Sequence, residues 1–361
     1  MIFVKSEDLK YGMRLAKPIY NKTGVLLYER NTRLTLQGIE SVKNFGLLGL
    51  YILEPAEPVP PMSEEDLDFE RFQTMAVFSI REELDNIIAG REPINLKRLA
   101  NAIITNYGRL DHKITFTQHL RSTTDYVYIN TAILCALISA QVYYTPTEQE
   151  ELVLAALLHD IGKLLLPNKV REKYDDYDTN DLIIVKKIQN DGLGLLRPEI
   201  GIDSGVRRIV AQIHRMEYGN SNLEQGKILK STKILKVANL FDTMTCMKIS
   251  EEAISEIAAI KYLLLNKDEF DEEIVGALIK SINILTPGVC IELTNREKGL
   301  VISENPQNIL RPVVLGFSTN KIYDLSNNGV YRRYQIVDIM KTMDNRIKVD
   351  RERLEEYMNK R

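Results

Sequence analysis

Six stretches between residues 129 and 265 carry apolar residues at the three- and four-residue spacing of an α-helix, and this series constrains the fold more than any other feature. Each stretch has a broad apolar face, which a helix in water buries against other helices. We therefore predict an α-helical bundle in the middle of the chain. The expected helices cover residues 129–142, 148–159, 179–189, 204–215, 231–244 and 251–265.

A proline-rich segment at residues 54–62 separates the helical region from the start of the chain. Proline opposes both helix and central strand, so we expect an extended linker there. Before it, residues 1–53 are expected to form a small β-rich module with some helix. Its predicted strands lie at 17–20, 25–28 and 50–53, and its helix at 34–45. After the linker we expect a helical connector over residues 63–119, with a first helix at 63–89 that Ser63 can start.

The composition changes again after residue 285, where Pro287 and Gly288 follow a helix expected at 271–284. Short apolar runs separated by turn residues predict strands at 289–293, 299–303 and 312–317. A charged segment at 350–360 predicts a short terminal helix. We therefore expect a mainly α protein with a small amino-terminal α+β module and a small β-rich extension over residues 286–361.

Charge and cysteine usage narrow the class of protein. Lys and Arg total 47 against 50 Asp and Glu, so the net charge of -3 provides no broad basic field for a nucleic acid polymer. The three cysteines, Cys135, Cys246 and Cys290, are far apart in apolar sequence, which fits reduced buried thiols. The start of the chain lacks the apolar run of a signal peptide, and no run is long enough for membrane insertion. We expect a cytoplasmic protein.

His159 and Asp160 stand side by side at the end of an apolar helical stretch. Imidazole and carboxylate together suit iron, manganese or zinc, and such a metal can polarise a phosphoryl oxygen and activate water. A catalytic metal normally needs three or more protein ligands. The alternative is structural, with the carboxylate orienting and balancing a buried imidazole. Lys163 could contact a phosphate, or be an ordinary solvated lysine near a helix end.

The stretch 154–163, Leu-Ala-Ala-Leu-Leu-His-Asp-Ile-Gly-Lys, resembles the signature of the HD-GYP branch of the HD phosphohydrolases. Residues 9–27 and 270–293 are similar to the modules that flank this domain in the family. The resemblance implies an HD-type helical bundle over residues 120–285. It also implies relationship to enzymes that use divalent iron or manganese to hydrolyse the bacterial messenger cyclic di-GMP.

Three apolar residues stand where the family motif has metal-binding histidines. Laying the motif on this sequence puts Val127 at the first histidine, Ile188 at the histidine before a glycine, and Ile213 at the first of two paired histidines. Aliphatic side chains are favoured where a pocket is dry and packed. We therefore predict that the former metal pocket is filled like a core.

Other departures weaken the site further. His214 remains from the histidine pair, but Arg215 replaces the glutamate that follows it. Asn239 stands at the place of a metal-binding aspartate, and its amide lacks the carboxylate charge. The Gly-Tyr-Pro triplet has no counterpart in residues 216–222.

These observations favour a bacterial signalling protein with impaired catalysis, which acts as a ligand-binding or protein-interaction module and binds no cofactor tightly. The alternative is an active phosphodiesterase in which His159, Asp160, His214 and Asn239 hold one iron or manganese ion while Lys163 steadies the phosphate. A third interpretation is a protein scaffold without a nucleotide ligand. The expected partners are cyclic di-GMP, a signalling protein and a second copy of the chain; no substrate-binding residue is assigned.

Overall fold

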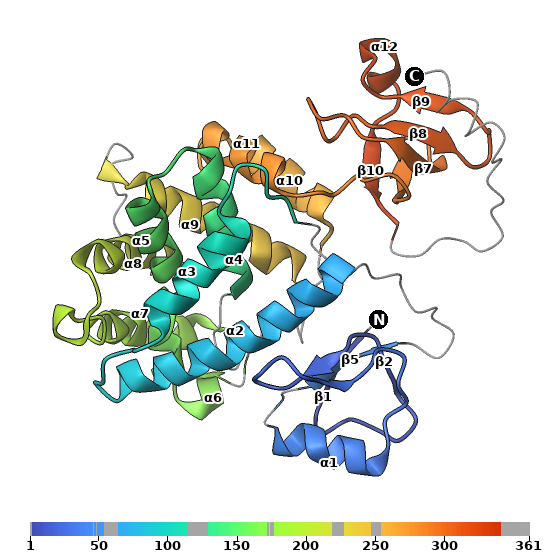
Figure 1. The fold of residues 1–361 in the computed structure, drawn as a ribbon. Helices are drawn as coiled ribbons and strands as arrows, with labels where there is room; N and C mark the ends of the chain where they lie inside the picture. The colour runs from blue at the N-terminus through green and yellow to red at the C-terminus, as the bar shows by residue number, and fades with distance from the viewer. Residues whose placement is uncertain are drawn as a thin grey trace. The chain divides into compact units, whose positions relative to one another are not determined.

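The computed structural model describes residues 2–45, 47, 49–53, 64–114, 129–171, 173, 177–218, 227–246 and 254–340. The chain divides into two compact units, Met1–Asp111 with Gln118–Ala253, and His112–Thr117 with Ile254–Arg361. Helices dominate the first unit, and an antiparallel sheet forms much of the second (Figure 1). The predicted fold class is confirmed: the protein is mainly helical, with small mixed strands at the amino end and a carboxyl-terminal sheet.

The amino-terminal module combines two small sheets with one helix. Strand β5 (Gly49–Leu53) pairs antiparallel with β1 (Ile2–Lys5) and β2 (Arg14–Leu15), and β3 (Ile19–Tyr20) pairs with β4 (Leu26–Tyr28). The predicted strands correspond to β3, β4 and β5, whereas β1 and β2 were not predicted.

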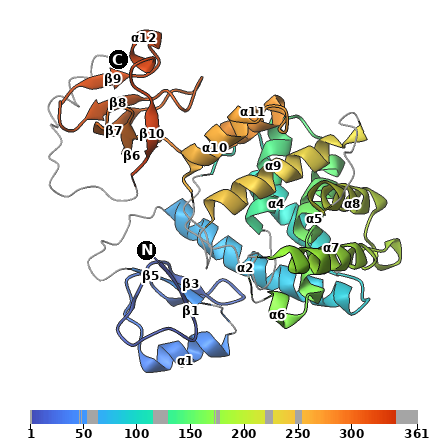
Figure 2. The ribbon, with the colours of Figure 1, turned by 180° about the vertical axis from the view of Figure 1, so that it is seen from behind.

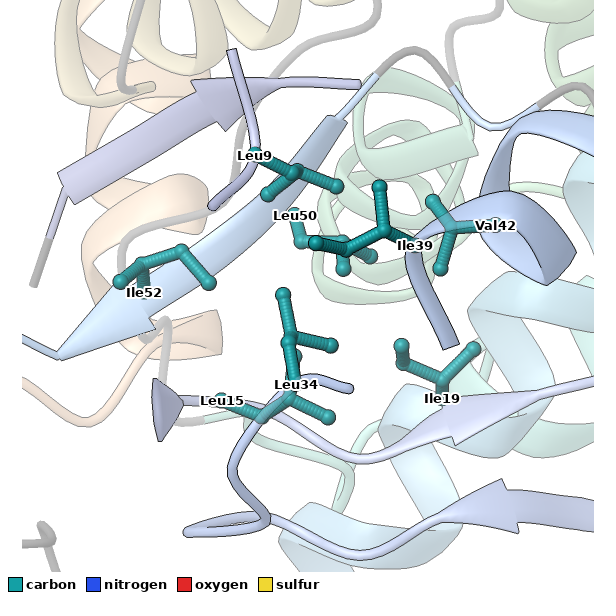
Figure 3. Packing of buried hydrophobic residues seen from close by; sticks show 8 residues of the cluster. All are labelled: Leu9, Leu15, Ile19, Leu34, Ile39, Val42, Leu50 and Ile52. Carbon is teal, nitrogen blue, oxygen red and sulfur yellow. The ribbon is translucent and has the colours of Figure 1, made fainter. Parts of the chain in front are cut away.

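Helix α1 (Leu36–Asn44) covers the core of this module. It begins at Thr35, whose side-chain oxygen accepts the backbone N–H of Gly38 at 3.0 Å. Figure 3 shows Ile39 and Val42 of this helix grouped with Leu50 of β5 in one apolar cluster. Residues distant in sequence thus share a small core, which explains why this segment folds as a module.

The remaining elements of the first unit are helical. They are α2 (Glu64–Ile88), α3 (Leu96–Tyr107), α4 (Ile129–Gln141), α5 (Pro146–Leu158), the 3₁₀ helix η1 (Ile161–Leu165), α6 (Asn168–Arg171), α7 (Thr179–Leu193), the 3₁₀ helix η2 (Pro198–Ile200), α8 (Ser204–Tyr218) and α9 (Lys230–Thr245). Helix α4 lies against α3, α5 and α9 (Figures 1 and 2). Its residues from Ile129 through Ala140 are all buried. A helix that is apolar all round forms the centre of such a bundle.

The predicted bundle helices are present with shifted ends. Helix α7 runs four residues beyond the predicted 189 and α8 three residues beyond 215. Asp178 caps α7 by accepting the backbone N–H groups of Asn180 and Asp181. Helix α10 begins at Glu256, and residues 251–253 of its predicted span lie outside the described residues.

The second unit joins two helices to a five-stranded antiparallel sheet. The helices are α10 (Glu256–Leu265) and α11 (Glu272–Ser281), and the strand order is β10-β6-β7-β8-β9. The elements are β6 (Cys290–Leu293), β7 (Lys298–Ser303), β8 (Val313–Gly316), β9 (Ile322–Asp324), the one-turn helix α12 (Asn328–Tyr331) and β10 (Ile336–Ile339). Strands β6, β7 and β8 were predicted, β9 and β10 were not, and the terminal helix predicted at 350–360 lies outside the described residues.

Two further findings concern the cysteines and the lengths of the helices. Cys135, Cys246 and Cys290 are buried free thiols, as predicted. In the ranges given above, no helix combines the length and the apolar character that crossing a membrane requires.

Candidate functional site

The His159–Asp160 pair lies at the end of a firmly positioned helix. Helix α5 starts with a capping box, in which the side chains of Thr145 and Glu148 each accept a backbone N–H of the other residue. It ends at Leu158, and His159 and Asp160 lead directly into η1. The two residues are 0% and 2% exposed, so their polar atoms need partners inside the protein.

The carboxylate of Asp160 has a protein partner on each oxygen. The ammonium of Lys163 lies 2.8 Å from Oδ2, and the Nε2 of Gln189 donates a hydrogen bond to Oδ1 at 2.5 Å. The Lys163 side chain is only 9% exposed, so this is a buried ion pair. The sequence left open whether Lys163 is a phosphate contact or a solvated lysine; here it is a buried counter-ion.

The two histidines are joined through the backbone. In His159, Nδ1 donates to the carbonyl of Ala156 at 2.8 Å, and Nε2 lies 3.9 Å from Oδ2 of Asp160. In His214 of α8, Nε2 donates to the carbonyl of His159. Burial lowers the pKa of His214, partly opposed by that hydrogen bond and by the Asp160 charge.

Two glycines allow η1 to lie directly against α7. A Cβ at Gly192 would stand 2.5 Å from the Cα of Gly162, and a Cβ at Gly162 would stand 2.8 Å from the carbonyl of Ile188. This backbone contact brings Gln189 of α7 to Asp160. Gln189 is therefore a site residue that the sequence analysis missed, because it stands one position after the residue that the motif indicated.

The apolar residues predicted to fill the pocket occupy different places. Ile213 is fully buried, as expected of a core residue. Ile188 is partly buried and packs on a separate cluster of Leu166, Val170 and Val185. Val127 lies outside the described residues.

Helix α9 presents two different polar groups. Asn239 is half-buried and its Nδ2 donates to the exposed Glu217 of α8 over a long 3.4 Å. The buried carboxylate of this helix is Asp242, which accepts hydrogen bonds from Thr131 Oγ1 at 2.8 Å and Cys246 Sγ at 2.9 Å. Asp242 therefore fastens α9 to α4.

Comparison with known proteins identifies the family. The HD domain family matches residues 86–274, which is more than half of the chain. The chain belongs to the HD domain family. The predicted resemblance is thereby confirmed, and His159 and Asp160 lie within the matched residues.

The relatives of this HD domain protein are distant. It is 23% identical to the cyclic di-GMP phosphodiesterase PA4108 of Pseudomonas aeruginosa over 61% of this chain and 53% of the relative. It is 25% identical to the cyclic di-GMP phosphodiesterase response regulator RpfG of Xanthomonas campestris over 54% of this chain and 49% of the relative. It is 22% identical to the cyclic di-GMP phosphodiesterase PdeB of Borreliella burgdorferi over 52% of this chain and 50% of the relative. The chain spans about half the length of the curated relatives it matches.

Around His159, the side chains that the structure describes do not form a set of ligands for a divalent metal. Of the predicted metal residues, the structure brings together His159, Asp160 and His214, but Asp160 already holds an ammonium and His214 directs one ring nitrogen to a carbonyl. Asn239 is engaged with Glu217. Among the residues that the structure describes, no three His, Cys, Asp or Glu side chains gather as ligands of one ion. The site therefore holds a buried ion pair, in which Lys163 is the cation and Asp160 is the anion.

Proposed function

We propose that this HD domain protein is a signalling protein with impaired phosphodiesterase activity, which binds cyclic di-GMP and acts through that binding. The relatives indicate the ligand class, since all three are cyclic di-GMP phosphodiesterases by name. The chain matches these relatives over 61%, 54% and 52% of its length, which supports a ligand of the same class.

One observation supports the loss of catalysis above the others: both carboxylate oxygens of Asp160 are bonded to protein donors, Lys163 and Gln189. A metal ion that displaced the Lys163 ammonium from Asp160 would leave that ammonium buried without its counter-ion, which costs several kcal/mol. The neighbouring Ile213 supplies no ligand in compensation. Binding without hydrolysis is therefore the function that this geometry favours.

Calorimetric titration and a turnover assay on the same anaerobically purified protein test the proposal. We expect saturable binding heat with cyclic di-GMP and no linear product after addition of Mn²⁺ or Fe²⁺. Asp160→Asn combined with Lys163→Met is the matched control, because it removes the charge that a metal would need without leaving the Lys163 ammonium buried beside a neutral side chain. The proposal requires that this variant still bind the nucleotide.

Two results would contradict it. Near-stoichiometric iron or manganese together with hydrolysis that Asp160→Asn abolishes would establish an active phosphodiesterase. Absence of binding heat at high nucleotide concentration would instead favour a protein-interaction module without a nucleotide ligand.

A further inference from the structure

The amino-terminal module places two arginines directly opposite each other on neighbouring segments. Arg14 of β2 forms an antiparallel bridge with Arg33. Backbone hydrogen bonds lie on either side of this bridge, from the N–H of Leu15 to the carbonyl of Thr32 at 3.0 Å and from the N–H of Leu34 to the carbonyl of Met13 at 2.8 Å. The two arginines are therefore a non-hydrogen-bonded pair, the kind in which facing side chains start closest together.

Both arginine side chains point away from the core of the module. Leu15 and Leu34 are each 1% exposed and belong to the apolar cluster that α1 covers (Figure 3). Neighbouring residues of an extended segment point to opposite faces, so Arg14 and Arg33 lie together on the face opposite to this cluster. Arg33 is exposed and Arg14 is half-buried, so water-borne ligands can reach the pair.

Asn31 orients one of the two guanidinium groups. Its Oδ1 accepts a hydrogen bond from Arg14 Nη1 at 3.2 Å. Asn31 has a φ of 67°, in the left-handed region that asparagine adopts more readily than most residues. Arginine has no acceptor, and the amide oxygen of Asn31 is already engaged, so these three side chains offer a ligand N–H donors.

The pair repeats at close range a charge surplus of the whole module. Residues 1–53 contain 8 Lys and Arg against 4 Asp and Glu, whereas the full chain has 47 against 50. Like charges directly opposite each other destabilise a strand pair. An anion that bridges Arg14 and Arg33 would remove this repulsion and accept charge-assisted hydrogen bonds from both.

We propose that Arg14 and Arg33 together bind a phosphate group with two negative charges, as in inorganic phosphate or a phosphomonoester. Guanidinium forks match the oxygens of phosphate, and a dianion balances both arginines at once. A phosphodiester such as cyclic di-GMP has a single charge on each phosphate, so this site is separate from the proposed nucleotide function. The phosphate belongs to a free small molecule or to a phosphorylated side chain of another protein, and the experiment distinguishes the two.

Isothermal titration calorimetry of the full chain, in a buffer without phosphate, tests the site. We expect saturable binding of inorganic phosphate and of a phosphoserine peptide. Tighter binding of the peptide would support the proposal with a phosphorylated protein as the source, and equal or weaker binding would support it with a free phosphate. Dimethyl phosphate, which has one charge, should bind severalfold more weakly than inorganic phosphate.

Two matched variants test the residues. Arg33→Gln removes one guanidinium at an exposed position and should weaken phosphate binding at least about tenfold, because charge-assisted hydrogen bonds contribute that much. Lys43→Gln removes one positive charge at an exposed position of α1, on the side of the apolar cluster. Salt screens that charge from the arginine pair, so the control should change the affinity by less than about twofold.

A third variant separates the charge of the pair from its folding. Arg33→Glu places a carboxylate opposite Arg14, so it should abolish phosphate binding and raise the unfolding temperature measured without phosphate. A variant that merely misfolded would lower that temperature, and such a fall would contradict the repulsion on which the site depends.

Three further results would overturn the proposal: no saturable heat with inorganic phosphate or the peptide, equal weakening by Arg33→Gln and Lys43→Gln, or dimethyl phosphate that binds as tightly as inorganic phosphate. Because these titrations contain no cyclic di-GMP, their failure is distinguishable from failure of the proposed function.

Discussion

At the scale of single residues, the decisive feature is the ion pair between the Lys163 ammonium and the Asp160 carboxylate. Lys163 and Asp160 are three residues apart in a 3₁₀ turn, so their ion pair is held by local backbone geometry. A buried pair contributes little net stability when intact, but removal of one partner leaves a charge that neither water nor protein balances. This asymmetry gives a prediction.

Lys163→Met should lower the free energy of unfolding by about 3 kcal/mol, because it leaves the Asp160 carboxylate buried without its cation. Urea denaturation measures the change. Lys169→Met, at an exposed position of α6, is the control and should change stability by less than about 0.5 kcal/mol. Adding Asp160→Asn to Lys163→Met should recover part of the loss, and failure to recover any would show that charge balance is not the reason.

At the scale of elements, close packing of η1 on α7 sets the geometry of the site. Gly192→Ala should destabilise the protein by about 2 kcal/mol, because its Cβ would lie 2.5 Å from the backbone of Gly162 and the two elements would have to separate. Gly276→Ala in α11 is the control, since nothing lies within 4 Å of its added Cβ. That variant should gain about 0.5 to 1 kcal/mol from helix propensity, measured by thermal unfolding. Equal effects of the two substitutions would contradict close packing as the cause.

The capping box of α5 makes a prediction with a pH dependence. Hydrogen bonds from the backbone N–H and the hydroxyl of Thr145 hold the pKa of Glu148 below its ordinary value. Its stabilising contribution is therefore complete above the unfolded pKa of about 4.3 and is lost as the pH falls through the lower folded pKa. Glu148→Gln should flatten the stability curve in that acid window, because the variant lacks this contribution at higher pH and matches the original protein once Glu148 is protonated.

Thr145→Ala tests the same cap at neutral pH and should cost about 1 kcal/mol. Thr147→Ala, at an exposed position in the first turn of the same helix, should cost less than about 0.5 kcal/mol. Denaturant titration of both variants measures the difference. An equal loss in the two would mean that helix propensity, and not the cap, determines the effect.

At the scale of the whole molecule, burial explains which parts could be predicted from the sequence. Helices such as α4 have apolar faces over three or more turns, so their periodicity identifies them. Length does not separate the strands that were missed from those that were predicted, because β1, β2, β9 and β10 have two to four residues, as do β3, β4, β6 and β8. They form because distant segments pair with them, and that information is not local.

In the site, too, some contacts could be predicted from the sequence and others depend on packing between distant segments. The nearness of His159, Asp160 and His214 follows from a family motif that the sequence carries. The contact of Gln189 with Asp160 depends on the phase of α7, which the Gly162–Gly192 contact fixes across 30 residues of chain. The role of Lys163 depends on how deeply η1 is buried, and sequence reasoning therefore left its alternatives open.

The final prediction concerns dependence of the folded state on metal. A bound ion at a concentration 100 times its Kd would add about 2.7 kcal/mol to the stability, and its removal would lower the unfolding temperature by several degrees. Because Lys163 already provides the cation for Asp160, exhaustive chelation should change the unfolding temperature by less than about 1 °C. Differential scanning calorimetry before chelation, after it and after addition of MnCl₂ measures this. A fall of several degrees that Mn²⁺ restores, and that Asp160→Asn no longer shows, would establish a metal ion where we place the ammonium.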